Sequence, residues 1–169
     1  MFINSIGFNL FGFNLAWFGL VYWGNNFIPL CLLLLVAHFI FIAKSQNEIP
    51  LILAITFIGI SVDSVLVHFN VFIFVNGGHI PFWLMMLWAC FATTITHSLR
   101  FLSASKVLQF FVGGIFAPLS YIAGYKFQAV EFGQSMASTY LLLSVIWAGL
   151  FILFFYLKDK LIKAEVSYV

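Results

Sequence analysis

Four ionisable side chains stand out in this chain because they interrupt stretches that are otherwise apolar. Asp63 lies in the middle of one such stretch, His38 near the end of another, and His97 and Arg100 close a third. An ionised carboxylate is costly in apolar surroundings unless it is paired, so Asp63 should be protonated, hydrated or bonded to another polar group. Its expected partners are the polar side chains that can lie at the same depth: His38, His97, Thr93 and Thr94.

These residue types could support two kinds of chemistry. An Asp–His pair in a low-dielectric interior can hold a histidine as a general base or pass a proton, which makes Asp63 and His97 the candidate catalytic residues. The planar guanidinium of Arg100 can grip a phosphate or a carboxylate. The residues expected to bind a substrate are His38, Thr93, Thr94, Arg100, Tyr121 and Asn14. The alternative is structural, since an Asp–His contact can lock helices and threonine hydroxyls often bond to carbonyls of their own helix.

Motifs of the better known enzyme and cofactor classes are absent from the sequence. It holds no Gly-x-Ser-x-Gly, His-Glu-x-x-His or Cys-x-x-Cys pattern, no phosphate-binding glycine loop and no histidines spaced four residues apart. A metal site assembled from His38, Asp63 and His97 is a lesser alternative, and we expect neither a metal nor another cofactor. The net charge of +2 comes from a few cations at the ends of apolar stretches, which argues against a nucleic-acid partner.

The composition assigns the chain to the integral membrane proteins. Hydrophobic residues make up 64% of the chain and charged residues 7%, with a mean hydropathy of +1.13, whereas charged residues are about a quarter of a soluble protein. Crossing the hydrocarbon core takes about 20 apolar residues. We therefore expect one all-α domain over residues 1–169, a compact bundle of six transmembrane helices at about 6–23, 27–43, 51–75, 81–99, 107–125 and 135–157.

The positive charges predict the orientation of this bundle. Six of the seven follow the second, fourth and sixth apolar stretches, which share one side of the membrane in a six-helix chain: Lys44, Arg100, Lys106, Lys158, Lys160 and Lys163. Lys126 is the exception, and Glu131 nearby offsets its charge. By the positive-inside rule that side is the cytoplasm, so both termini should be cytoplasmic. No Lys or Arg precedes the first stretch and no small-residue cleavage site follows it, so we expect no cleaved targeting segment.

Small and polar residues mark the helix faces expected to point inward. Thr56, Gly59, Asp63 and Asn70 share a narrow stripe of the third stretch, and Asn14 should lie on the bundle-facing side of the first. The fifth stretch has a second stripe, which would let a neighbouring helix or a partner membrane protein approach closely: Gly113, Ala117, Ser120 and Gly124.

A set of these residues resembles an uncharacterised family of small bacterial inner-membrane proteins, known as a domain of unknown function. The resemblance spans nearly the whole chain and is carried by Asn14 with Trp17-Phe18, Asp63, Trp88 with Phe91-Ala92-Thr93-Thr94, His97-Ser98-Leu99-Arg100, Gly113-Gly114, Pro118, Ser120-Tyr121 and Gly124. Phe101 and Ile122 stand where the family pattern usually has Trp. The resemblance implies a multi-helix protein of the bacterial inner membrane and, because such genes often lie beside cyclopropane-fatty-acid synthases, favours lipid chemistry.

Three functions remain open at this point. The first is binding, with modification or presentation, of a lipid or other hydrophobic molecule at a site in the cytoplasmic half lined by His38, Asp63, Thr94, His97 and Arg100. The second is a substrate-binding subunit of a transporter, to which the six helices are similar in outline. The third is a structural or assembly partner that uses the stripe beginning at Gly113. The residues leave open whether the protein is an enzyme.

Overall fold

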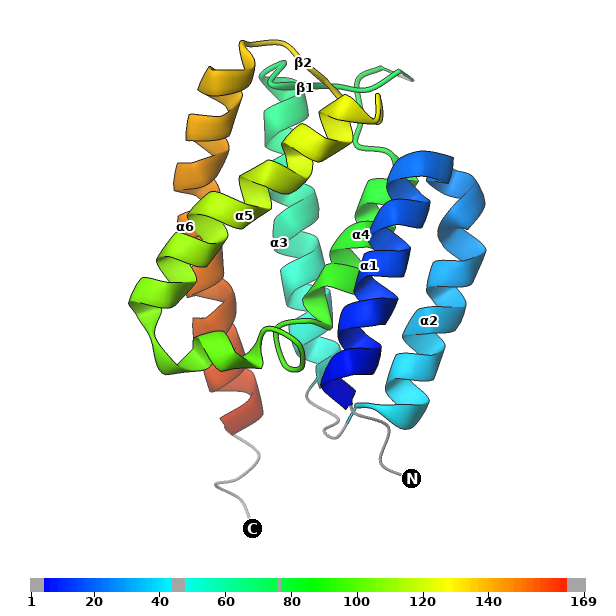
Figure 1. Ribbon diagram of the computed structural model, residues 1–169, viewed down its shortest axis with the longest axis vertical. Coiled ribbons are helices and arrows are strands. Elements are labelled where there is room, and N and C mark those ends of the chain that lie inside the picture. Colours follow the sequence, from blue (N-terminus) through cyan, green and yellow to red (C-terminus); the bar gives the residue numbers. More distant parts are fainter. Residues whose placement is uncertain (1–4, 44–47, 76, 164–169) are drawn as a thin grey trace.

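The computed structural model describes residues 5–43, 48–75 and 77–163. Within these ranges the chain folds into six α-helices with two short strands (Figure 1). The helices are α1 (Ser5–Trp23), α2 (Ile28–Phe41), α3 (Glu48–His68), α4 (Phe82–Ala92), α5 (Lys106–Lys126) and α6 (Met136–Lys163). A 3₁₀ turn, η1 (Gly24–Phe27), joins α1 to α2, and another, η2 (Arg100–Ala104), precedes α5.

Four stretches of the described chain are long and apolar enough to cross a membrane. They are Ile6–Phe41, which contains α1, η1 and α2, then Glu48–His68, Lys106–Lys126 and Met136–Ile162. The fold is therefore all-α with helices of membrane-spanning length, as expected. The fourth predicted helix, at 81–99, is only 11 residues long, too short to span about 30 Å by itself.

Two predicted helices end early because a local hydrogen-bonding pattern replaces the helical one. The third was expected to reach residue 75, but α3 ends at His68. Two residues later, Asn70 adopts a left-handed φ of 54°. The amides of Asn70 and Val71 then bond to the carbonyls of Val67 and Leu66, a Schellman motif. The chain continues as β1 (Phe72–Ile73), which pairs antiparallel with β2 (Glu131–Phe132).

The fourth helix ends at Ala92 in a run of β-branched residues. The hydroxyls of Thr93 and Thr94 bond to the carbonyls of Cys90 and Phe91, so these carbonyls are satisfied without a further helical turn. The chain then proceeds by turns to Arg100. Thr93, Thr94 and His97 are buried, which suits a membrane protein because irregular backbone is tolerated at membrane depth only inside protein.

An aromatic core joins α4 to α6, and α5 packs closely on α6. The Trp88 and Trp147 rings stack with centroids 5.0 Å apart. A Cβ at Gly113 would lie 2.6 Å from the Trp147 carbonyl oxygen, so only glycine permits this approach of α5 to α6. Gly113 therefore faces a helix of its own chain, while Ser120 and Gly124 line a cavity described below.

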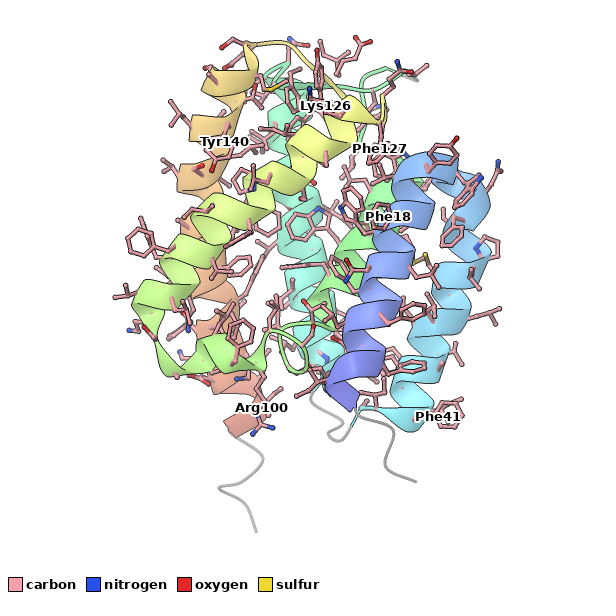
Figure 2. The ribbon with its side chains drawn as sticks, viewed as in Figure 1. Phe18, Phe41, Arg100, Lys126, Phe127 and Tyr140 are labelled. Carbon is pink, nitrogen blue, oxygen red and sulfur yellow. The ribbon has the colours of Figure 1, made fainter. Side chains whose placement is uncertain are left out.

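One end of the bundle collects the start of α1, the end of α6 and Arg100 (Figures 1 and 2). The β1–β2 pair, Lys126 and Phe127 lie at the opposite end. The grouping of Arg100 with both helix ends agrees with the expected charge pattern. Lys44, which also supported that pattern, lies outside the described residues, as does the side chain of Lys163.

Candidate functional site

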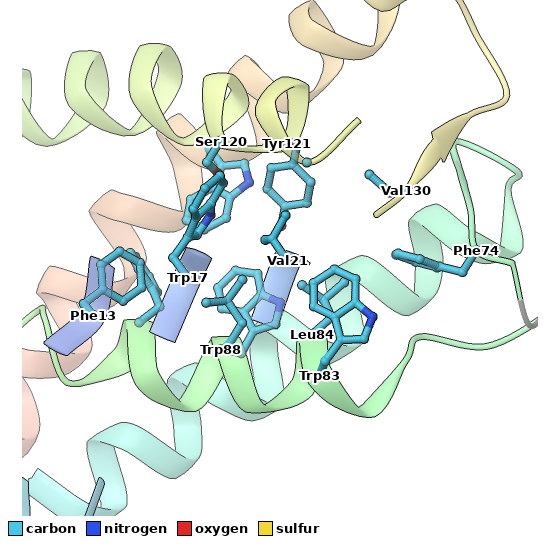
Figure 3. A pocket seen from close by; sticks show the side chains of 14 residues that line it. Phe13, Trp17, Val21, Phe74, Trp83, Leu84, Trp88, Ser120, Tyr121 and Val130 are labelled. Atoms are coloured by element: carbon cyan, nitrogen blue, oxygen red, sulfur yellow. The ribbon is translucent and has the colours of Figure 1, made fainter. Parts of the chain in front are cut away.

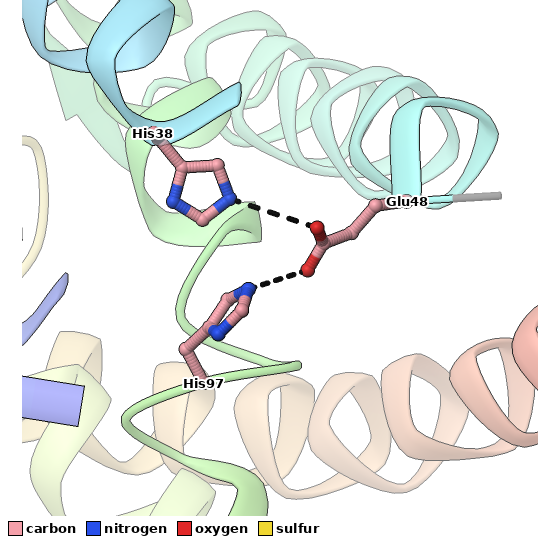
Figure 4. Close-up of side chains that lie close together, drawn as sticks. All are labelled: His38, Glu48 and His97. Carbon is pink, nitrogen blue, oxygen red and sulfur yellow. Dashed lines mark hydrogen bonds and ion pairs between the residues drawn. The ribbon is translucent and has the colours of Figure 1, made fainter. Parts of the chain in front are cut away.

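The first polar cluster joins three elements near the end of the bundle where α1 begins. His38 lies near the end of α2, Glu48 is the first residue of α3, and His97 follows α4 (Figure 4). Glu48 Oε1 lies 2.6 Å from His97 Nε2, and Glu48 Oε2 lies 3.9 Å from His38 Nε2. All three side chains are buried. We call His38, Glu48 and His97 the histidine–glutamate cluster.

The two carboxylate oxygens of Glu48 have different surroundings. Oε1 accepts a hydrogen bond from the Thr96 hydroxyl and pairs with His97, and the amino end of α3 favours a negative charge at this position. Glu48 Oε2 and His38 Nε2, although buried, have no hydrogen-bond partner within the described residues. The distance of 3.9 Å between these two atoms is too long for a hydrogen bond.

The second polar cluster lies about four turns further along α3 and contains Asp63, Trp88 and Tyr121. The indole Nε1–H of Trp88 donates to Asp63 Oδ2 at 2.7 Å, and the Tyr121 hydroxyl lies 3.1 and 3.2 Å from the two carboxylate oxygens. Asp63 is 1% exposed. The expectation that Asp63 pairs with His38, His97 or the Thr93 and Thr94 hydroxyls was therefore wrong. The carboxylate instead ties α3 to an indole of α4 and a phenol of α5. We call it the aspartate–aromatic cluster.

Gly59 makes room for the indole of that cluster. It lies one turn before Asp63 on α3, and a Cβ built on it would lie 2.0 Å from the Trp88 ring. Four residues place Gly59 and Asp63 on the same helix face. Gly59 therefore lets the Trp88 ring pack directly against α3, where Asp63 accepts a hydrogen bond from its N–H.

An aromatic pocket adjoins the second cluster. It has a volume of about 70 Å³, is partly open, and lies between α1, α4, α5 and α6 (Figure 3). Trp88 and Tyr121 present ring surface to it while their polar atoms bond to Asp63. Phe74 and Val130, from the segments next to β1 and β2, border it at one end. Its other aromatic walls are Phe13, Trp17, Trp83, Phe91 and Trp147.

The structure separates the remaining candidate residues. Asn14, expected to face the bundle, is exposed, and its amide donates to the Leu10 carbonyl of its own helix at 2.8 Å. Asn9 is the buried asparagine of α1, and its amide donates to Thr93 Oγ1 at 3.0 Å. At 100° per residue two positions five apart cannot share one face, which explains the error. Arg100 is exposed at the end of the bundle.

The sequence-based hypothesis missed two residues of these clusters. Glu48 lies between the expected helices 27–43 and 51–75, although a carboxylate two positions before Pro50 is typical of the first turn of a helix. Trp88 was not identified as a partner of Asp63, and no spacing in the sequence indicates that contact, which depends on how two helices are rotated.

Comparisons with known proteins identify the family of the chain but no related protein of known function. A family model described as a protein of unknown function (DUF2878) matches residues 6–153. No curated protein and no solved structure matches the chain. The match extends from α1 into α6 and so includes both clusters.

Proposed function

The chain belongs to the DUF2878 family of unknown function, so we infer its role from its own sites. We propose that it binds a segment of a lipid acyl chain in the aromatic pocket. The observation that carries this proposal is a partly open cavity with aromatic and aliphatic walls in a bundle of membrane-spanning length. Such walls favour an apolar guest, and concave apolar sites with few polar groups are the usual form of small-molecule sites.

The size of the pocket limits what it can enclose. An apolar cavity of about 150 Å³ is enough to hold benzene, and this one measures about 70 Å³. It would therefore take only part of a hydrocarbon chain, with the rest of the molecule remaining among the surrounding lipids. The pocket is lined by α1 and α5, so a chain lying along the bundle could enter between these helices.

Binding or presentation fits this pocket better than modification does. The hydroxyl of Ser120 bonds to the Ala117 carbonyl, and that of Tyr121 bonds to Asp63, so neither is placed as a nucleophile or base. Asp63 is thus a positioning residue, because it fixes the two aromatic walls Trp88 and Tyr121. This replaces the catalytic role expected for Asp63 from the sequence.

We place the protein as a multi-pass protein of the bacterial inner membrane, with the end that carries Arg100 in the cytoplasm. The positive-inside rule supports this orientation, and Arg100 would then lie near the headgroups. Of the other functions, the assembly role loses support because Gly113 packs on α6, while Ser120 and Gly124 line the pocket. No contact of the described residues favours a transporter subunit.

A quenching experiment tests the proposal. Trp17, Trp83, Trp88 and Trp147 line the pocket, so a fatty acid brominated along its chain should quench tryptophan fluorescence of the purified protein in detergent, and the quenching should saturate. Ser120→Phe fills the pocket and should weaken the apparent affinity by about tenfold or more, which is 1.4 kcal/mol.

The matched control is Ser61→Phe. Ser61 also bonds to a carbonyl of its own helix, at 2.8 Å, but it is exposed on α3 away from the pocket. Circular dichroism reports whether each variant is folded. Quenching that rises in proportion to the bromine content of the micelles without saturating, or equal affinity in both folded variants, would refute binding in the pocket.

A further inference from the structure

The histidine–glutamate cluster is unexplained by lipid binding, since none of its three residues lines the aromatic pocket. We propose that His38, Glu48 and His97 bind a divalent transition-metal ion. One nitrogen of each histidine and one oxygen of Glu48 all lie within 4.8 Å of one another, and all three residues are buried.

Two buried side-chain atoms of the cluster have no hydrogen-bond partner among the described residues, and both can act as metal ligands. His38 Nε2 and Glu48 Oε2 belong to residues that are 4% and 3% exposed, yet neither atom has a hydrogen-bond partner within the described residues. Buried polar atoms without partners are rare in native proteins. The gap of 3.9 Å between these atoms is too wide for a hydrogen bond and is within the span of two ligands on one ion.

The distances are compatible with a metal centre after small side-chain rotations. Ligands bound at about 2.0–2.2 Å from one zinc ion lie at most about 4.4 Å apart, and about 3.3 Å apart at the tetrahedral angle. The ligand atoms, which lie within 4.8 Å of one another, would have to come within about 4.4 Å. The His38 Nε2–Glu48 Oε2 pair at 3.9 Å would close slightly, the His97 Nε2–Glu48 Oε1 pair at 2.6 Å would open, and the carboxylate would bind through one or both of these oxygens. The hydrogen bond between His97 and Glu48 would be lost, and any proton on His97 Nε2 would be released on binding.

The donor set selects the class of metal. Two imidazoles with one carboxylate suit zinc and iron(II), whereas magnesium and calcium prefer oxygen ligands. Three protein ligands leave at least one coordination position open, as in catalytic zinc sites and iron(II) oxygenases.

The surroundings support such a centre in two ways. The Thr96 hydroxyl donates to Glu48 Oε1 and so orients the carboxylate, as groups outside the ligand shell commonly do. A second cavity of about 30 Å³ borders His38 and is lined also by Asn9 and Thr93. It has room for about one water molecule, with polar groups to hold it.

Metal analysis of the full-length protein in detergent tests the proposal. The protein purified without chelators should contain about one zinc or iron per chain. After the metal is removed, titration with Co²⁺ should produce visible ligand-field absorption that saturates at about one ion per chain. Zn²⁺ should raise the thermal unfolding midpoint, because a ligand that binds only the folded state stabilises it.

Two variants separate a built site from an adventitious one. Glu48→Gln keeps the shape and an acceptor for Thr96 but removes the charged ligand, so we expect Co²⁺ affinity to fall by about 100-fold or more. His68→Gln removes an exposed histidine outside the cluster and should leave affinity unchanged. The thermal shift with Zn²⁺ should vanish in Glu48→Gln and persist in His68→Gln.

Several outcomes would overturn the metal proposal. One is a wild-type protein that, after Co²⁺ titration, shows no ligand-field bands and no thermal shift. Another is equal Co²⁺ affinity in wild type and Glu48→Gln. If Glu48→Gln fails to fold, the wild-type titration decides alone. Failure of any of these tests leaves binding in the aromatic pocket untouched, because the quenching experiment involves different residues.

Discussion

The histidine–glutamate cluster and the aspartate–aromatic cluster each place one carboxylate in a buried part of α3, but they satisfy it differently. Asp63 accepts hydrogen bonds from Trp88 and Tyr121 on both of its oxygens. Glu48 is satisfied at Oε1, while Oε2 faces His38 across 3.9 Å without a hydrogen bond. A carboxylate with every oxygen bonded stabilises the fold, whereas one with an unpartnered oxygen facing an imidazole nitrogen has capacity left for a ligand. Substitutions that remove polar groups should therefore have opposite consequences in the two clusters.

The largest effect is expected for Asp63→Leu. It leaves the Trp88 indole and the Tyr121 hydroxyl without their acceptor, and an unsatisfied buried donor costs about 1–3 kcal/mol. The free energy of unfolding should fall by roughly 2–6 kcal/mol. It can be measured by circular dichroism during titration of detergent micelles with SDS. Asp63→Asn keeps an acceptor oxygen and serves as the matched control. If the leucine variant is as stable as the asparagine variant, the carboxylate of Asp63 does not hold the aromatic walls.

A smaller loss of unfolding free energy is expected for Gly59→Ala, which fills the space that the Trp88 indole occupies against α3. The added methyl of Gly59→Ala would lie 2.0 Å from the Trp88 ring, so the ring must shift from the position in which it bonds to Asp63. Overpacking of this kind costs about 1–3 kcal/mol. Gly149→Ala on α6 is the control, because no other atom of the described chain lies within 4 Å of its added Cβ, and it should be neutral or stabilising by up to about 1 kcal/mol. Equal unfolding free energies for the two alanine variants would contradict the proposed role of Gly59.

The helices were largely predictable because hydropathy is a property of the sequence alone. Apolar stretches of sufficient length place α1, α2, α5 and most of α6 within a few residues of their observed limits. The failures occurred where side chains compete with the helical hydrogen bonds, as at Thr93, or where one residue turns left-handed, as at Asn70. The end of α3 has no strong signal because the residues that follow it, 69–75, are still mostly apolar. The end of α4 is hard to locate for another reason: threonine hydroxyls also bond to carbonyls inside helices, so the threonines after Ala92 do not by themselves mark a helix end.

The polar clusters were predictable as residues but not as contacts. The cost of charge in an apolar setting singled out Asp63, His38 and His97 from the sequence, and His38 does approach His97, with ring centroids 4.9 Å apart. Their actual partners depend on the rotation of each helix about its axis. An error of one residue in a helix changes that direction by about 100°. This is why Asp63 was paired with the histidines. Glu48 was missed for a different reason, since the third helix was expected to begin at residue 51 and α3 begins at Glu48.

The smallest effect, and the most informative in sign, is expected for His38→Leu in the presence of a chelator. His38 Nε2 has no hydrogen-bond partner to lose in the part of the chain that the structure describes, and replacing a buried unsatisfied group by an apolar one is neutral or stabilising. We therefore expect the unfolding free energy to stay within about 1 kcal/mol of wild type or to rise. With Zn²⁺ added the order should reverse, because wild type would gain stability from the ion and the variant would not.

His68→Leu controls for the loss of an imidazole at an exposed position and should respond to Zn²⁺ as wild type does. A clear loss of stability for His38→Leu under chelator would mean that His38 contributes to the fold without a ligand. In that case the histidine–glutamate cluster would be a structural pair like the aspartate–aromatic cluster. A reversal on adding Zn²⁺ would instead show that the histidine–glutamate cluster lowers the stability of the metal-free protein and raises that of the metal-bound protein. Functional sites are often less stable than they could be in this way.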